Sequence, residues 1–339
     1  MRNVGIVSYG LYIPESIQTA EDISNIYHIP VDVVKKKQGL LSKHVSKKDE
    51  MPSEMAIKAA KKAIEKATLK GIGKDDIGMI LYVGSQWKDY HVWLMSTYIQ
   101  DALGIEGAFS LDMSSMCTGI VFGLYVAKKI LSSSTEGKSI LLVGASKESY
   151  IVDPENRSTN WMDNFADAGV AAIVAPDFSE NLILSSDFMS DGSLSFSVLE
   201  RGGGAKEPCY PDYCSRNRIY LEGLMDKERM KSILDNKSVE NFRMVIERSI
   251  KKSGIKTEDV SKIFLNHMKP TFHNEILASL GIPERKSYYL ERFGHSQSAD
   301  QFIALDQVIS ETGFSTGNIV FAAAGTGYVW GSTVIKWGR

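Results

Sequence analysis

The sequence predicts a layered α/β fold built from two similar halves, and three observations lead to that prediction. Short apolar segments suited to buried strands alternate with longer segments in which apolar residues recur at helical spacing. This alternation occurs twice along the 339 residues. The composition, 43% hydrophobic and 24% charged, is that of a globular protein long enough for about two domains with a substantial core. We therefore expect sheets whose faces are covered by helices.

The first half is expected to span residues 1–177. It opens with a short buried strand at 4–7, which is closed by Gly10. A helix that begins at Pro52 and ends near Gly71 carries small and apolar residues on one side and lysines on the other. The alternation continues with strands at 77–85, 108–113, 139–145 and 169–176 and with helices at 96–104 and 118–131.

The second half is expected to span residues 178–339 and repeats the rhythm. It includes a glycine-rich loop at 201–208 and a long helix around 227–252. Its other elements are strands at 182–188, 262–267, 318–325 and 332–337 and helices at 271–281 and 299–310. Because no low-complexity linker separates the halves, we expect them to pack as one rigid body.

Charge and cysteine usage exclude several classes of function. The net charge of -2 and the scattered lysines give no footprint for nucleic acid. No signal peptide is apparent, and no segment approaches the roughly 18 uninterrupted apolar residues of a membrane span, so we expect a cytoplasmic protein without membrane contact. The three cysteines, Cys117, Cys209 and Cys214, lack disulfide or zinc spacing, so we expect reduced thiols and no metal.

Cys117 is the first candidate catalytic residue. It stands where the strand at 108–113 gives way to the helix at 118–131, so its sulfur faces unpaired N–H groups and the positive end of the helix dipole. Such a place favours a reactive thiolate. A lone cysteine is more often a small hydrophobic residue between helix and sheet, so other residues must support the catalytic interpretation.

Two histidines and a turn supply that support. His267 ends a predicted strand, and His295 precedes a predicted helix. Since open α/β sheets gather ligands at the carboxyl ends of their strands, we expect a Cys–His–His site there. The small-residue turn at 322–332 has backbone N–H groups that suit an oxyanion, although an ordinary tight hairpin would have the same composition.

Ordered motifs occur over essentially the whole chain: GIVSYGLYIPE, LDMSSMCTGIVFGLYVA, DPENRST, FADAGVAAIVA, RGGGAKEP, NHMKPTFHNEILASLGIP, FGHSQSADQFIALDQ and GTGYVWGSTVIKW. In this order and spacing they resemble the thiolase superfamily, and most closely the β-ketoacyl-acyl-carrier-protein synthase III family. The resemblance implies a thiolase-like fold, with two related βαβαβαββ halves in a five-layer αβαβα arrangement, and a homodimer. It places the nucleophilic cysteine in the first half and the two histidines in the second.

The resemblance also assigns roles. Cys117 would take an acyl group from a thioester, and His267 and His295 would hold the carbonyl of a malonyl-type thioester while it loses carbon dioxide. The N–H groups of Cys117 and Thr326 would form the oxyanion hole. The implied function is an acyltransferase of the condensing type, in fatty-acid-like or polyketide-like biosynthesis, that needs no cofactor beyond its thioester substrates. Four further positions are implied to bind substrate: Lys37, Val92, Arg157 and Phe165.

Departures from the family pattern concern substrate choice. His295 stands where most members of the type III family carry asparagine. Val33 and Lys37 align with the tryptophan and arginine that flank the adenine and phosphate of coenzyme A. Weaker stacking and fewer phosphate contacts are therefore expected for coenzyme A, which would suit a carrier-protein-bound or otherwise unusual acyl donor. A degradative thiolase needs a second cysteine in the last glycine-rich turn, and the turn AAAGTGYVWG has none. A hydroxymethylglutaryl-coenzyme A synthase needs a glutamate at the position of Gln86. Both differences favour a decarboxylative reaction.

Two alternatives to decarboxylative condensation stay open at this point. One is acyl transfer from Cys117 to an alcohol or amine. The other is a non-catalytic subunit that binds a catalytic homologue, against which the complete Cys–His–His set argues. A cysteine peptidase receives little weight, because no local motif of that class is present.

Overall fold

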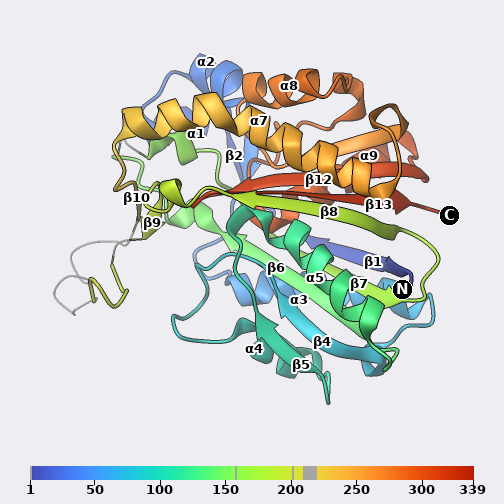
Figure 1. Cartoon of the computed structure of the whole chain (residues 1–339). Helices are drawn as coiled ribbons and strands as arrows, with labels where there is room; N and C mark the ends of the chain where they lie inside the picture. Colours follow the sequence, from blue (N-terminus) through green and yellow to red (C-terminus); the bar gives the residue numbers. More distant parts are fainter. Residues whose placement is uncertain (1, 157–158, 201, 209–219) are drawn as a thin grey trace.

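The computed structural model describes residues 2–156, 159–200, 202–208 and 220–339. Its strands form a nine-stranded mixed sheet in the order β11-β12-β13-β8-β1-β7-β6-β4-β5 (Figure 1). The bounds are β1 Val4–Tyr12, β4 Ile77–Tyr82, β5 Phe109–Asp112, β6 Ser139–Lys147, β7 Asp167–Pro176, β8 Leu182–Ser190, β11 Val260–Leu265, β12 Gly317–Gly325 and β13 Val329–Trp337. The predicted strands are therefore present, several of them longer than predicted.

This sheet consists of two similar parts. In the first, β1, β7 and β6 pair antiparallel, and β6, β4 and β5 pair parallel. In the second, β8, β13 and β12 pair antiparallel, and β12 and β11 pair parallel. The pairing between β1 and β8 is confined to Gly5 with Leu182. A parallel bridge from Ile263 to Ser287 occupies the place in the second part that β5 has in the first.

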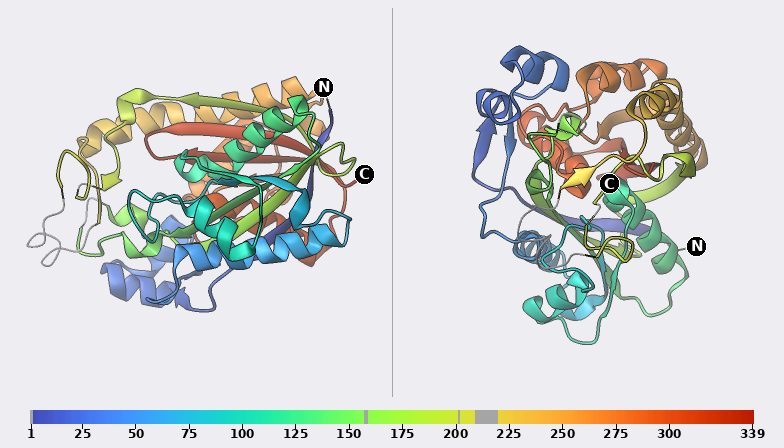
Figure 2. Two further views of the ribbon diagram at one scale, coloured as in Figure 1. Left: turned by 90° about the horizontal axis from the view of Figure 1, so that it is seen from below. Right: turned by 90° about the vertical axis from the view of Figure 1, so that its left-hand side faces the viewer.

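Helices lie on both outer faces and between the two parts of the sheet. Their bounds are α3 Pro52–Thr68, α4 Met95–Leu103, α5 Gly119–Ser133, α7 Lys227–Ser253, α8 Pro270–Ser279 and α9 Asp300–Thr312. One apolar core joins α5 and α9 to strands of both parts, a second joins α3 and α4 to the first part, and a third joins α7 and α8 to the second. In the right-hand view of Figure 2, the orange α8 lies near the top of this stack and the teal α4 near the bottom. The predicted five-layer, thiolase-like arrangement is confirmed.

Several short elements were not predicted. They are β2 Ile17–Thr19, α1 Ala20–Tyr27, α2 Val31–Val33, the π-helix η1 Val34–Gln38, β3 Ser42–His44, β9 Leu199–Glu200 and β10 Leu221–Glu222. The helix α1 has a capping box in which Thr19 and Asp22 bond each other's backbone N–H groups. Its buried face joins Met162 and Phe165 in a small fourth core, which covers one end of the sheet.

The helical stretch Met116–Ser133 is long and apolar enough to cross a membrane by length and composition, which the sequence analysis did not expect. Half of this stretch is buried inside the fold, where α5 lies between the two parts of the sheet. A core helix in this position has the same composition as a membrane span. The predicted boundary at residues 177 and 178 falls between β7 and β8, and the division into two units there stays a prediction.

Candidate active site

Cys117 lies at a strained corner between β5 and α5. It is in the short 3-10 turn η3, Met116–Thr118, and is 5% exposed. The preceding Met116 has a φ of 51°, a left-handed conformation that non-glycine residues adopt mostly where function requires it. A Cβ on Gly119 would lie 1.9 Å from the carbonyl oxygen of Val83, so α5 begins in direct contact with the backbone after β4. These constraints fix the sulfur at the first helical turn, as predicted.

The turn after β12 touches the backbone of Cys117. A Cβ on Gly325 would lie 3.0 Å from the Cys117 nitrogen, so only glycine permits this approach. Thr326 follows directly. Among the hydrogen bonds between described residues, neither the Cys117 nor the Thr326 backbone N–H donates to another group. The two N–H groups are therefore available for an oxyanion.

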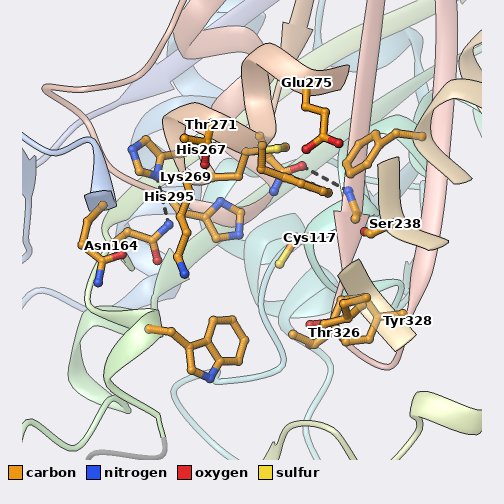
Figure 3. Close-up of a pocket in the computed structure, with 18 of the residues that line it drawn as sticks. Cys117, Asn164, Ser238, His267, Lys269, Thr271, Glu275, His295, Thr326 and Tyr328 are labelled. Carbon is orange, nitrogen blue, oxygen red and sulfur yellow. Dashed lines mark hydrogen bonds between the residues drawn. The ribbon is translucent and has the colours of Figure 1, made fainter. Parts of the chain in front are cut away.

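His295 links Cys117 to a buried carboxylate. Its Nδ1 donates to Oδ2 of Asp300 at 2.7 Å. The Cys117 sulfur is close enough to interact electrostatically with the ring. Figure 3 shows the His295 ring on the side of the cavity toward Cys117, with His267 beyond it. Burial disfavours the charged ring, but Asp300 and Cys117 outweigh burial and raise the pKa of His295 well above its ordinary value. This shift favours the protonated, cationic form of the His295 ring beside the sulfur.

His267 has a different environment. Its Nδ1 accepts from the Asn164 amide at 2.9 Å, which leaves the proton on Nε2, 3.3 Å from the carbonyl oxygen of Gly39. Burial lowers its pKa to about 4, against the opposing effect of Asp300. The ring is therefore a neutral N–H donor at neutral pH. The structure thus distinguishes two histidines that the sequence analysis treated alike.

Asp300, the first residue of α9, is a site residue that the sequence analysis missed. It is fully buried, and besides His295 it accepts the backbone N–H of His267 at 2.8 Å and that of Ser296 at 2.7 Å. An acidic residue in the first turn of a helix is common, because it interacts favourably with the helix dipole, and so does not by itself indicate a functional site. The signal that could have found it is the spacing HSQSAD, which places a carboxylate five residues after His295.

A cavity of about 410 Å³ connects these groups to the surface. Cys117, His267, His295, Thr326 and Phe165 all line it, so the structure brings these predicted site residues together. Asn164 lines the cavity too and contacts both histidines. Its side-chain amide donates to His267, and its backbone carbonyl oxygen accepts the backbone N–H of His295 at 2.8 Å. The Phe165 ring meets the His295 ring at 5.4 Å between centroids.

The other predicted substrate-binding residues lie elsewhere. Lys37 is exposed on η1, and its neighbour Gln38 lines the cavity instead. Val92 is fully exposed and lines neither of the two cavities beside Cys117. Arg157 lies outside the described residues, as do Cys209 and Cys214. The substrate-binding roles of these positions stay predictions.

Comparison with known proteins agrees with this architecture. The profile of 3-oxoacyl-[acyl-carrier-protein (ACP)] synthase III matches residues 111–192, and the profile of its C-terminal part matches residues 250–337. The β-ketoacyl-[acyl-carrier-protein] synthase III of Fusobacterium nucleatum is 28% identical over 339 residues, which cover 99% of each chain.

Solved structures show the same fold. The crystal structure of 3-oxoacyl-[acyl-carrier-protein] synthase III from Aquifex aeolicus has a TM-score of 0.83 at 23% identity, covering 98% of this chain and 100% of that one. The priming β-ketosynthase of the R1128 polyketide biosynthetic pathway has a TM-score of 0.84 at 20% identity, covering 100% of this chain and 97% of that one.

Fold and relatives together define a class, the condensing enzymes of thiolase-like fold. The chain belongs to the 3-oxoacyl-[acyl-carrier-protein] synthase III family. The predicted family and the predicted broad function, a condensing enzyme of fatty-acid or polyketide biosynthesis, are therefore confirmed.

Proposed function

We propose that the protein takes an acyl group on Cys117 and joins it to a malonyl-type thioester by decarboxylative condensation. One observation carries this proposal. Cys117 shares a cavity with a cationic His295, a neutral His267 and two backbone N–H groups that have no acceptor among the described residues. The first pair suits acylation, and the remaining donors suit the negative charge that develops on carbonyl oxygens.

In acylation the thiolate of Cys117 attacks the carbonyl carbon of the donor thioester. The N–H groups of Cys117 and Thr326 hold the oxyanion of the tetrahedral intermediate. The bond to the leaving sulfur then breaks, and that sulfur takes the proton from His295, which becomes neutral. Asp300 keeps the His295 ring oriented throughout, because it accepts from Nδ1.

In condensation the malonyl-type thioester loses carbon dioxide, and His267 donates its Nε2 proton toward the resulting enolate oxygen. The enolate carbon attacks the acyl carbonyl, a carbon–carbon bond forms, and the bond to Cys117 breaks. The thiolate is thus restored, and His295 regains its proton from solvent. The Nε2–H of His267 makes only a 3.3 Å contact with Gly39 in the free enzyme, so little is lost when it turns to substrate.

The two half-reactions provide the test. With an acyl thioester, intact-mass analysis should show one adduct that is absent in Cys117→Ala. His295→Ala should slow this acylation by about 10²-fold. His267→Ala should leave acylation largely intact and slow the release of carbon dioxide by about 10²-fold. Acylation that is lost in His267→Ala and retained in His295→Ala would reverse these roles.

A second candidate is acyl transfer from Cys117 to an alcohol or amine. The proximity of Cys117 to His295 and the hydrogen bond from His295 to Asp300 favour it, because a neutral His295 could remove the proton from such an acceptor after acylation. The product separates the two: an ester or amide without carbon dioxide, or a carbon–carbon bond with it.

The proposed donors are thioesters of coenzyme A or of carrier-protein phosphopantetheine, whose arm would enter through the 410 Å³ cavity. No further cofactor is proposed, and a cytoplasmic location stays a prediction.

We also propose a homodimer. β5 ends the sheet order, so its outer edge is unpaired within the described chain. Large apolar side chains are exposed on β5 and around α4, and we call them the β5 patch: Tyr90, Val92, Leu94, Tyr98, Phe109 and Leu111. A second copy that continues the sheet would bury this patch.

A further inference from the structure

A second, smaller cavity adjoins Cys117. Its volume is about 140 Å³, and Cys117, Phe165 and Thr326 line both cavities. The proposed function, on which this inference rests, requires a place for the acyl group beside the sulfur. Because the larger cavity holds the two histidines, we assign the acyl group to the smaller one.

The lining of the smaller cavity is not that of a hydrocarbon pocket. Apolar side chains such as Ile151, Val198 and Leu221 form part of it. Glu148, Glu200 and Gln297 line it as well. A cavity built for an alkyl chain gains nothing from carboxylates in its lining, since an alkyl group offers them neither a hydrogen bond nor a charge.

Gln297 carries a buried acceptor for which the described residues supply no donor. The residue is 1% exposed, and its Nε2 donates to Oε1 of Glu148 at 2.8 Å. Its own Oε1 is buried and has no hydrogen-bond partner among the described residues. The backbone at Gln297 has a φ of 54°, in the same left-handed region as that of Met116, and both residues line this cavity.

The two glutamates add negative charge. Glu148 is 7% exposed, and its Oε1 also accepts from Ser85 Oγ at 2.8 Å. The side chain of Glu200, on β9, is 21% exposed, and its buried Oε1 has no hydrogen-bond donor within the described part of the chain. His91 Nε2 lies 3.8 Å from this oxygen, an ion-pair distance when that ring is protonated but longer than a hydrogen bond. Burial raises the pKa of each carboxyl, an effect that a cationic ligand would offset.

We propose that the acyl group taken by Cys117 is short and carries a protonated amine, which donates to Gln297, Glu148 and Glu200. An ammonium group has three donors and no acceptor, which matches a set of acceptors that includes two carboxylates. The ring of Trp87, which also lines the cavity, offers a further surface for a cation. A hydroxyl would supply one donor and no charge.

The volume limits the length of this acyl group. A buried protein cavity of about 150 Å³ accommodates a benzene molecule, so roughly six non-hydrogen atoms fit here. The group is therefore a small aminoacyl unit rather than a fatty acyl chain.

Three pantetheine thioesters of equal heavy-atom number test the proposal: β-alanyl, butyryl and 3-hydroxypropionyl. The rate of adduct formation on Cys117 is followed by intact mass. In the unmodified enzyme β-alanyl should react at least about tenfold faster than butyryl, the effect of one charge-assisted hydrogen bond. Glu200→Gln and Glu148→Gln should each bring this ratio toward one. The control Glu65→Gln, on the exposed side of α3, should leave the ratio unchanged.

The outcomes separate this inference from the function beneath it. If butyryl acylates Cys117 as fast as β-alanyl, the aminoacyl assignment is wrong and the proposed acylation stands. Fastest reaction with 3-hydroxypropionyl likewise rejects the amine. If none of the three forms an adduct, the proposed acylation fails and the inference with it. Circular dichroism of the two glutamine variants shows whether a changed ratio comes from a folded enzyme.

Discussion

Asp300 accepts hydrogen bonds from His295 Nδ1 and from the backbone N–H of His267, and we expect its negative charge to affect the rate of acylation. Asp300→Asn keeps the size of the side chain but removes the charge that raises the pKa of His295. We expect acylation to slow by roughly 10- to 100-fold, the range for a charge-assisted hydrogen bond. The high-pH limb of the acylation profile should move to lower pH, because the imidazolium now loses its proton more easily. Adduct formation measured across pH checks both effects.

Asp306→Asn is the matched control, since Asp306 lies on the same helix and accepts from Tyr9 at 2.8 Å, away from Cys117. A purely structural role for Asp300 would lower the melting temperature and leave the pH profile where it was, and that result would contradict our interpretation.

At the scale of residues, the sequence predicts a site residue where its type and its place in the chain together indicate chemistry. Cys117 and the two histidines were predicted from their places at strand ends. The different charge states of the two histidines could not be predicted from the sequence. They depend on contacts with Asn164 and Asp300, and Asn164 reaches His267 only because segments far apart in the sequence pack together. The polar cavity lining was missed for the same reason, since Glu148 and Glu200 come from separate loops and strands.

At the scale of elements, the contact between the end of β12 and η3 places the two backbone N–H groups. In Gly325→Ala the new Cβ would lie 2.9 Å from Met116 Cβ and 3.0 Å from both the Cys117 nitrogen and the Ser115 oxygen. The turn must shift away from Cys117, so we expect acylation to fall by about 10²-fold, the cost of one oxyanion donor. Gly192→Ala adds a Cβ where nothing lies within 4 Å, and its acylation rate should not change. Equal rates in the two variants would show that this contact does not set the oxyanion hole.

The long elements were predictable because their patterns are strong. Helix α3 alternates alanines and lysines over 17 residues, and β7 is buried over nearly its whole length. The short strands β2, β3, β9 and β10 have two or three residues each, too few for a period to appear. They form where tertiary contacts hold them, as in the small core over α1.

For the whole molecule, the β5 patch predicts association. Phe109→Lys combined with Leu111→Lys puts charge on the edge strand, and we expect light scattering to change from a dimer mass to a monomer mass at micromolar concentration. Leu69→Lys is the control, because Leu69 is 86% exposed at the end of α3, outside the patch. A monomer mass for the unmodified protein would contradict the proposed dimer.

Global stability should depend on pH through two buried histidines. Burial lowers the pKa of His267 and of His273 to about 4, below the unfolded value near 6.5. The unfolded chain therefore binds more protons between these values, and stability falls as pH decreases from about 6.5 to 4, by up to about 3 kcal/mol for each histidine. Urea unfolding of the unmodified protein and of His273→Phe should show a smaller loss of stability in the variant across this range, by up to about 3 kcal/mol. Asp163, whose pKa is raised to about 6 by burial, contributes in the opposite direction in both proteins, so the difference between them reports His273. A variant with an unchanged slope would show that His273 does not stay neutral in the fold.

Cys117 lies just before α5. His295 lies just before α9, and Asp300 is the first residue of α9. These two helices occupy corresponding positions in the two parts of the molecule. Cys117 and the pair of His295 and Asp300 thus come from equivalent places in the two parts, each beside the start of a helix of the shared core. Because each part supplies only one member, the thiol and the imidazole face each other only where the two parts pack together. The arrangement therefore depends on the packing of α5 and α9 as much as on the residues themselves.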